Sequence, residues 1–188
     1  MHYLVLISLF FSLQAFGATL ISRQFPSLLI PVSQDAPNTA LGTQYTGQVA
    51  IRNGSHQIYT EVLFDIPPNA ATSCNLSFSI STSRPAPWTL TPSPPFPGPF
   101  IFNISTLSSA PNKCLDTWNH RPSVKDWVAT VEVKHDGSVK MTGGKVGCLK
   151  GQTANFLVYP GRAGTMGLEW FEEADPVHGI TYEMWTDE

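Results

Sequence analysis

The chain has few charged residues: Asp, Glu, Lys and Arg make up 13% of its 188 residues, about half the share usual in soluble proteins. A helical bundle needs such residues on its solvent-exposed faces. In addition, no stripe of apolar residues with helical spacing continues for more than two turns. The net charge of −3 gives no reason to expect nucleic-acid binding, which needs a clustered basic face. The composition therefore argues against a helical bundle and against a nucleic-acid partner.

Sequence motifs that specify a reaction are also missing. There is no GxSxG nucleophile elbow, no HExxH zinc helix and no phosphate-binding glycine loop. No pair of cysteines has zinc-type spacing, and the histidines are scattered, so we expect neither a metal nor another cofactor. The sequence therefore predicts a non-catalytic protein. The scattered histidines are His56, His120, His135 and His178.

In place of charge, the chain carries 16 prolines and 14 glycines, a balance that suits β-strands joined by long connections. The clearest local signal is a hairpin, in which Tyr45–Arg52 and Gln57–Ile66 alternate polar and apolar residues and are joined by Asn53-Gly54. We predict an all-β fold, an antiparallel β-sandwich of about eight to ten strands. The expected strands are 28–32, 45–52, 57–66, 74–81, 100–107, 127–133, 155–159, 167–171 and 180–185, with 139–146 as a weaker tenth.

A proline-rich segment interrupts this pattern between Arg84 and Phe100, where seven of seventeen residues are proline. Proline has no amide hydrogen to donate, so the segment cannot be a central strand. It predicts an extended, polyproline-like loop.

The N-terminus predicts export. Leu4 to Phe11 is an uncharged apolar run, and the small residues Ala15 and Gly17 suit cleavage before Ala18. The run is about half the length that spans a bilayer, so we expect no membrane anchor. The predicted organisation is a signal peptide over 1–17, a short lead over 18–26 and one β-sandwich domain over 27–188. The predicted location is extracellular, with the cell wall as one possible destination.

Three Asn-x-Ser sequons agree with export, at Asn53, Asn75 and Asn103. Asn53 lies in the predicted turn of the hairpin, where a glycan has room. Asn75 and Asn103 lie within predicted strands, so their modification requires an outward-facing side chain.

Three cysteines are an odd number for an oxidising compartment. One disulfide and one remaining thiol is the simplest arrangement. The spacing does not determine the pairing; we favour Cys74 with Cys148, because both flank strong strand patterns, which leaves Cys114 free.

Five tryptophans raise the possibility of a surface that stacks on sugar rings. Trp127, Trp170 and Trp185 fall in strand patterns, which favours a place in the core. Trp88 in the proline-rich loop and Trp118, followed closely by His120, fall in predicted loops, and these three residues are the candidate binding surface.

Acidic residues are concentrated near the C-terminus: Ala163 to Glu188 holds seven acids and no Lys or Arg. The favoured interpretation is that these terminal strands pack near the basic stretch Lys113–Arg162, and the alternative is an acidic binding face. Glycoside hydrolysis needs two carboxylates facing one cleft. Glu169, Glu172 and their neighbours Glu173 and Asp175 could supply them, although solvated strand ends explain these acids more simply.

Several short motifs in order resemble the fungal But-two C-terminal domain family. They are Leu29–Ser33, Pro37–Ala40 with Gly42–Tyr45, Phe64–Pro67 followed by Cys74–Phe78, Cys148 with Gly151–Thr153, and Gly167–Glu172. The resemblance covers about Ser27 to Trp185. It implies a β-sandwich, often exported, with no established catalytic residues, and a family association with the activating subunit for a ubiquitin-like modifier.

Together these observations predict a secreted fungal surface or cell-wall-associated protein that binds a glycan or an extracellular protein. The alternatives are a divergent secreted hydrolase and an effector-like interaction protein.

Overall fold

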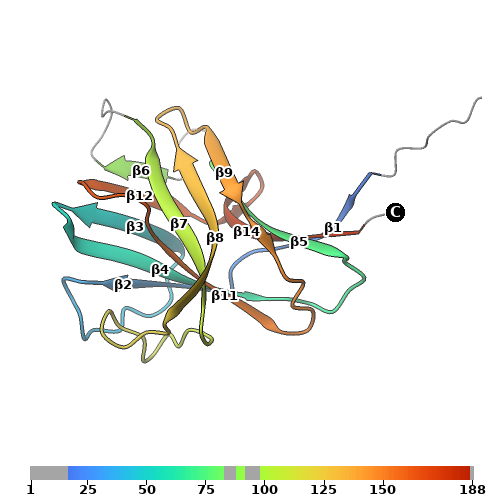
Figure 1. The fold of residues 1–188 in the computed structure, drawn as a ribbon, viewed down its shortest axis with the longest axis horizontal. Coiled ribbons are helices and arrows are strands. Elements are labelled where there is room, and N and C mark those ends of the chain that lie inside the picture. The colour runs from blue at the N-terminus through green and yellow to red at the C-terminus, as the bar shows by residue number, and fades with distance from the viewer. Residues whose placement is uncertain (1–16, 83–87, 92–97, 187–188) are drawn as a thin grey trace, which may run out of the picture.

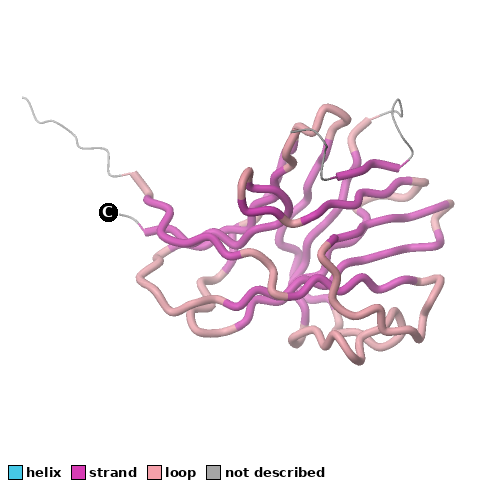
Figure 2. Tube along the Cα trace, turned by 180° about the vertical axis from the view of Figure 1, so that it is seen from behind, coloured by secondary structure: helices cyan, strands magenta, loops and turns pink. Residues whose placement is uncertain are grey.

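The computed structural model describes residues 17–82, 88–91 and 98–186, and each regular element in these ranges is a β-strand (Figures 1 and 2). The strands form antiparallel sheets, which confirms the predicted all-β sandwich. No helix long and apolar enough to cross a bilayer occurs in the described part of the chain. The strands are β1 (Thr19–Gln24), β2 (Leu28–Ser33), β3 (Thr46–Arg52), β4 (Ser55–Asp65), β5 (Ser73–Ser79), β6 (Trp88–Thr91), β7 (Phe100–Leu107), β8 (Val124–Val133), β9 (Val139–Gly143), β10 (Lys145–Val146), β11 (Thr153–Pro160), β12 (Met166–Phe171), β13 (Glu173–Ala174) and β14 (Val177–Thr186).

The larger sheet runs in the order β6-β12-β3-β4-β11-β7-β8-β9, with β2 added to β4. Strand β4 is the long shared element: its beginning pairs with β3, and its remainder pairs with β11 on one side while β2 lies on the other. Although three strands separate β12 from β7 in this order, the rings of Trp170 and Phe102 stack with centroids 6.4 Å apart. The sheet therefore curls over until its two ends face each other.

The main core fills the space inside this curl. Phe78 of β5 contacts both rings edge-on, at 5.4 Å from Trp170 and 5.1 Å from Phe102. Alternation explains the arrangement, because successive strand residues point to opposite faces. Val62 and Phe64 of β4 point inward and are fully buried, and the smaller sheet closes the remaining side.

A second apolar layer lies on the outer face of β4. Ile30, Glu61 and Leu157 are direct cross-strand neighbours there, and all three are buried. They are covered by the connection between β7 and β8, residues 108–123, which we call the strap (Figure 1). This second layer explains why β2 and β11 are apolar on both faces.

The smaller sheet, in the order β1-β14-β5-β10, projects to one side as an arm (Figures 1 and 2). The stretch 18–26, expected as a short lead, contains β1. This strand pairs with β14, and the Arg23 guanidinium lies 2.8 Å from the Glu183 carboxylate.

The structure confirms the predicted hairpin of β3 and β4. Asn53 and Gly54 have φ angles of 52° and 72°, the left-handed values that a two-residue turn requires. Within the proline-rich segment, however, the proline-free residues Trp88–Thr91 form β6, an edge strand on β12. The expectation of a continuous loop is therefore wrong at these four residues, and the flanking residues 83–87 and 92–97 lie outside the described ranges.

Candidate functional site

The strap carries Trp118 and His120, two of the candidate binding residues. The Trp118 ring packs 4.7 Å from the Tyr59 ring, and the Arg121 guanidinium lies 4.3 Å from the Trp118 ring centroid. A guanidinium over an indole face is a stable cation–π contact that occupies the face. Trp118 is therefore packed between Arg121 of the strap and Tyr59 of β4, and His120 is exposed close to it in the chain.

Trp88, the other candidate, is half-buried at the start of β6. Its Nε1 donates a hydrogen bond to the Ser81 carbonyl at 2.9 Å, and its ring packs against the main core. Trp88 and Trp118 thus come from different elements, and both are half-buried.

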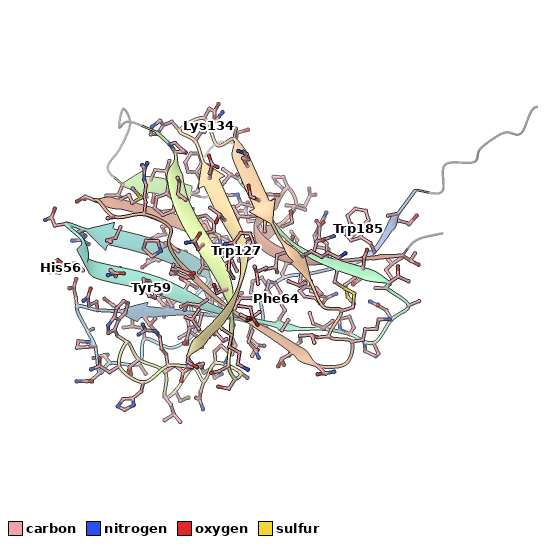
Figure 3. The ribbon with its side chains drawn as sticks, in the orientation of Figure 1. His56, Tyr59, Phe64, Trp127, Lys134 and Trp185 are labelled. Carbon is pink, nitrogen blue, oxygen red and sulfur yellow. A yellow bond between two sulfur atoms is a disulfide. The ribbon has the colours of Figure 1, made fainter. Side chains whose placement is uncertain are left out.

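The exposed indole belongs instead to Trp127 on β8 (Figure 3). Its side chain is 53% exposed, so the expectation that it lies in the core is wrong. The reason is an irregularity in the β7–β8 pairing at Ser105, which interrupts the inward–outward alternation just where Trp127 falls. Of the other two tryptophans expected in the core, Trp170 is fully buried and Trp185 is half-buried on the arm (Figure 3).

Two contacts fix the Trp127 indole. Its Nε1 donates to Thr130 Oγ1 at 3.2 Å, and that hydroxyl donates in turn to Asn103 Oδ1 at 2.7 Å. A Cβ built at Gly143 would lie 2.8 Å from Trp127 Cη2. The ring therefore rests over Gly143, where any side chain would displace it.

A pocket of about 400 Å³ opens beside this indole; we call it the Trp127 pocket. Its lining combines apolar side chains with polar and charged ones. Among them, Asn155 Oδ1 is buried and has no hydrogen-bond partner in the described part of the chain. A buried acceptor without a partner costs about 1–3 kcal/mol, so a donor from a ligand would be stabilising here. The lining residues are Thr106, Leu107, Asp126, Trp127, Val128, Lys145, Val146, Gly147, Leu149, Thr153, Asn155, Phe156 and Tyr182.

The disulfide holds one wall of the Trp127 pocket. It joins Cys74 of β5 to Cys148, with the two Cα atoms 5.3 Å apart, the pair favoured from the sequence. Tyr182 secures the same wall, since its hydroxyl donates to the Gly147 carbonyl and accepts from the Leu149 amide. The remaining cysteine, Cys114 in the strap, is exposed and has a free thiol.

The three sequons differ in their surroundings. Asn53 is exposed in the β3–β4 turn, and its side-chain oxygen accepts from Thr165 Oγ1 at 3.1 Å. Asn75 is half-buried between β10 and β14, and Asn103 is half-buried on the outer face of β7. Asn53 is therefore the acceptor with the most space around it.

Two carboxyl groups are buried away from the Trp127 pocket. Glu61 lies beneath the strap next to Asp116, and burial, together with the negative charge of Asp116, raises its pKa to about 8. Burial also raises the pKa of Glu172, to about 7. The described residues contain no group of three or more His, Cys, Asp or Glu side chains placed to hold a metal ion.

Sequence reasoning missed Trp127 and Asn155, because both lie in strand patterns that normally indicate burial. A usable signal was present only in part: Val124-Lys125-Asp126 precedes Trp127 with poor alternation, which is typical of a strand that leaves its sheet.

Comparison with known families assigns residues 24–176 to the family described as the Ubiquitin 3 binding protein But2 C-terminal domain. The match extends from the end of β1 into the turn before β14, and it includes the strap, the disulfide and Trp127. No curated protein matches the chain.

Proposed function

Because the chain belongs to the But2 C-terminal domain family, we propose that it is a non-catalytic binding protein that is exported and holds a glycan in the Trp127 pocket. The observation that carries this proposal is the fixed, exposed indole of Trp127, which lines the same pocket as Asn155 with its unpartnered side-chain oxygen. A flat aromatic face packs on the apolar face of a pyranose, and the hydroxyls at the ring's edge need fixed polar partners.

Export is supported by the apolar run over Leu4–Phe11, by the Cys74–Cys148 disulfide and by the exposed Asn53 sequon. Disulfides persist in oxidising compartments and are rare in the cytosol. A polysaccharide of the fungal cell wall is the ligand that such a destination offers.

A glycan suits the Trp127 pocket better than a purely apolar ligand. Asp126 and Lys145 bring opposite charges to its lining, and Asn155 brings the unpartnered acceptor. An apolar molecule would leave these groups without partners, whereas hydroxyl groups both donate and accept.

Catalysis finds little support in the same pocket. A glycosidase needs two carboxyl groups about 5–10 Å apart across the scissile bond, and among the described lining residues Asp126 is the one carboxylate. Glu169 Oε2 accepts a hydrogen bond from Gln48 Nε2 at 2.7 Å on the outer face of β12. Glu172 is buried outside the Trp127 pocket. We therefore rank the divergent-hydrolase alternative below the binding functions.

The test uses the protein secreted from its own full-length gene in a fungal host. We expect Ala18 as the first residue, a loss of mass on removal of N-glycans, and depletion from solution by one of chitin, β-glucan or cellulose. Trp127→Ala should abolish depletion, whereas Tyr45→Ala, which removes an 83% exposed aromatic outside the pocket, should not. Retention by none of the three, or release of soluble sugar from one of them, would overturn the proposal.

A protein ligand is the second candidate, and the family description favours it. Titration of the purified protein with ubiquitin, followed by NMR, separates the two. Chemical-shift changes centred on Trp127 would show that the ligand of the Trp127 pocket is a protein and not a glycan. An effector-like role with some other protein would leave both the polysaccharide and the ubiquitin experiments negative.

A further inference from the structure

A second pocket, of about 280 Å³, lies where β3 begins and β12 ends. Its walls come from the segment before β2, from the connection between β2 and β3, and from Glu172. Among the described lining residues Glu172 is the only charged one. We call it the Glu172 pocket, and its lining residues are Pro26, Ser27, Leu29, Thr43, Gln44, Tyr45 and Glu172.

The Glu172 carboxyl group is rigidly held through one of its two oxygens. Oε1 accepts from Trp170 Nε1 at 2.7 Å and from the Ile180 amide at 3.0 Å. The group also fills the place where a side chain at position 179 would stand, since a Cβ built on Gly179 would lie 2.2 Å from Oε2. The carboxyl group is therefore fixed in place before any ligand arrives.

The second oxygen is left without a partner. Oε2 is buried and makes no hydrogen bond to the described residues, and burial raises the pKa of this carboxyl group to about 7. A buried carboxylate normally has a cation or several donors around it. In Glu172 the protein supplies two donors to Oε1, whereas none of the described residues supplies a donor to Oε2.

The surroundings supply no cation. No Lys or Arg is among the described lining residues, and Glu173 and Asp175 follow Glu172 directly in the chain. Strand β14 packs near the basic stretch 113–162 as expected, since Tyr182 is hydrogen-bonded to Gly147 and Leu149, but among the described residues no ion pair joins an acid of this quarter to a Lys or Arg of that stretch. Glu183 of this quarter does form an ion pair, but its partner is Arg23 of β1. The negative charge around Glu172 is therefore not neutralised from within the described structure.

An aromatic pair stands at the same place. Tyr45 is 83% exposed and lines the pocket, and the neighbouring Phe171 is 41% exposed, with the two ring centroids 6.4 Å apart. Aromatic faces attract organic cations, most strongly where water is partly excluded. An aromatic wall beside a fixed carboxyl group has the chemistry that recognises an ammonium or a guanidinium group.

We propose that the Glu172 pocket receives a Lys or Arg side chain of a protein partner, with the cation paired to Glu172 and covered by the ring of Tyr45. The site is separate from the Trp127 pocket, since none of the described lining residues is shared. The basic side chain completes the hydrogen bonding of Oε2 and balances the charge of the Glu172 carboxylate.

The experiment titrates the secreted, 15N-labelled protein with the methylamides of N-acetyl-arginine and N-acetyl-lysine, and follows backbone amide shifts. We expect saturable shifts at Glu172, Gly179 and Ile180. Glu172→Gln keeps an oxygen for Trp170 and Ile180 but removes the charge, so it should weaken binding by about tenfold or more. Tyr45→Ala should weaken binding by about threefold to tenfold through loss of the aromatic contact.

Three controls make the result specific. Glu169→Gln removes an exposed carboxylate on the same strand but outside the pocket, and should leave the affinity unchanged. N-acetyl-citrulline methylamide has the shape of the arginine probe without its charge, and should not bind. Trp127→Ala should bind the cationic probes normally, so failure of the glycan proposal would leave this result intact. Equal binding by wild type and Glu172→Gln, shifts located elsewhere, or a preference for glucosamine oligomers over both probes would overturn the inference.

Discussion

The indole of Trp170 occupies the space above Gly47 on the neighbouring strand. The two residues are direct partners in the β3–β12 pairing, and a Cβ built on Gly47 would lie 2.1 Å from Trp170 Cζ2. Without a side chain at position 47, the ring lies flat across β3 and reaches the stack with Phe102 and Phe78. A single glycine thus permits the largest side chain of the core to join the two faces of the curled sheet.

Gly47→Ala should therefore destabilise the protein by about 3 kcal/mol, because Trp170 must move within a close-packed core. Urea unfolding followed by tryptophan fluorescence measures the change. Gly147→Ala is the matched control: a Cβ there meets no atom within 4 Å, so its effect should stay within about 0.5 kcal/mol. Equal stability of the two variants would contradict the role given to Gly47.

Glu61 should make stability fall as the pH rises. Its pKa is raised from 4.5 to about 8 in the folded protein, so between these values the folded state holds a proton that the unfolded state releases. Glu61 stabilises the folded state fully below pH 4.5, and its own contribution to the free energy of unfolding should fall by about 1.4 kcal/mol per pH unit up to about pH 8. Unfolding in urea at pH 6, 7 and 8 measures this slope.

Glu61 should account for most of the slope from pH 7 to 8, because the pKa of Glu172 is raised only to about 7 and half of its proton is released by pH 7. Glu61→Gln replaces the protonated acid by a neutral group of the same size, so the variant should lose most of the slope in that interval. A variant with the wild-type slope would show that another group releases the proton.

Local sequence patterns predicted most of this fold, since they depend on neighbouring residues alone. Alternation located the hairpin over Tyr45–Ile66 and the other long strands, and Asn53-Gly54 fixed its turn. The short strands β1 and β6 escaped prediction, because each is an edge strand defined by a distant partner, β14 and β12 respectively. Nothing in the few residues of β6 indicates which strand they will meet.

The site was harder to predict for the same physical reason. Alternation indicates that Trp127 points inward, and only the irregular pairing with Ser105 on β7 turns it outward. Conversely, Trp118 lies in a polar loop, and its packing depends on Arg121 and on Tyr59, a residue 59 positions earlier in the chain. Exposure of an aromatic residue is thus decided by tertiary contacts that one sequence does not reveal.

Loss of the disulfide should weaken both stability and glycan binding. Cys74 and Cys148 are 74 positions apart, and a loop of that size predicts a cost of about 4 kcal/mol when the link is removed. The wall that carries Val146 and Leu149 would then be held by the short β10–β5 pairing and the Tyr182 hydrogen bonds, without a covalent link. Cys74→Ser with Cys148→Ser should lower the melting temperature and the affinity for the retained polysaccharide. Cys114→Ser, which removes the exposed free thiol, should change neither quantity.

A substitution at Gly143 offers the sharpest test of the Trp127 pocket, because it should displace the indole without removing it. Gly143 has a φ of 87°, and an added Cβ would lie 2.3 Å from the Val128 carbonyl and 2.8 Å from Trp127 Cη2. Gly143→Ala should therefore displace the ring, reduce polysaccharide retention by about tenfold or more, and destabilise the fold by about 1–3 kcal/mol. Gly151→Ala is the control for backbone strain, since its φ of 72° is also left-handed but no atom lies within 4 Å of the added Cβ. If both variants lost retention equally, instability would be the cause; loss confined to Gly143→Ala would assign the binding to the position of the indole.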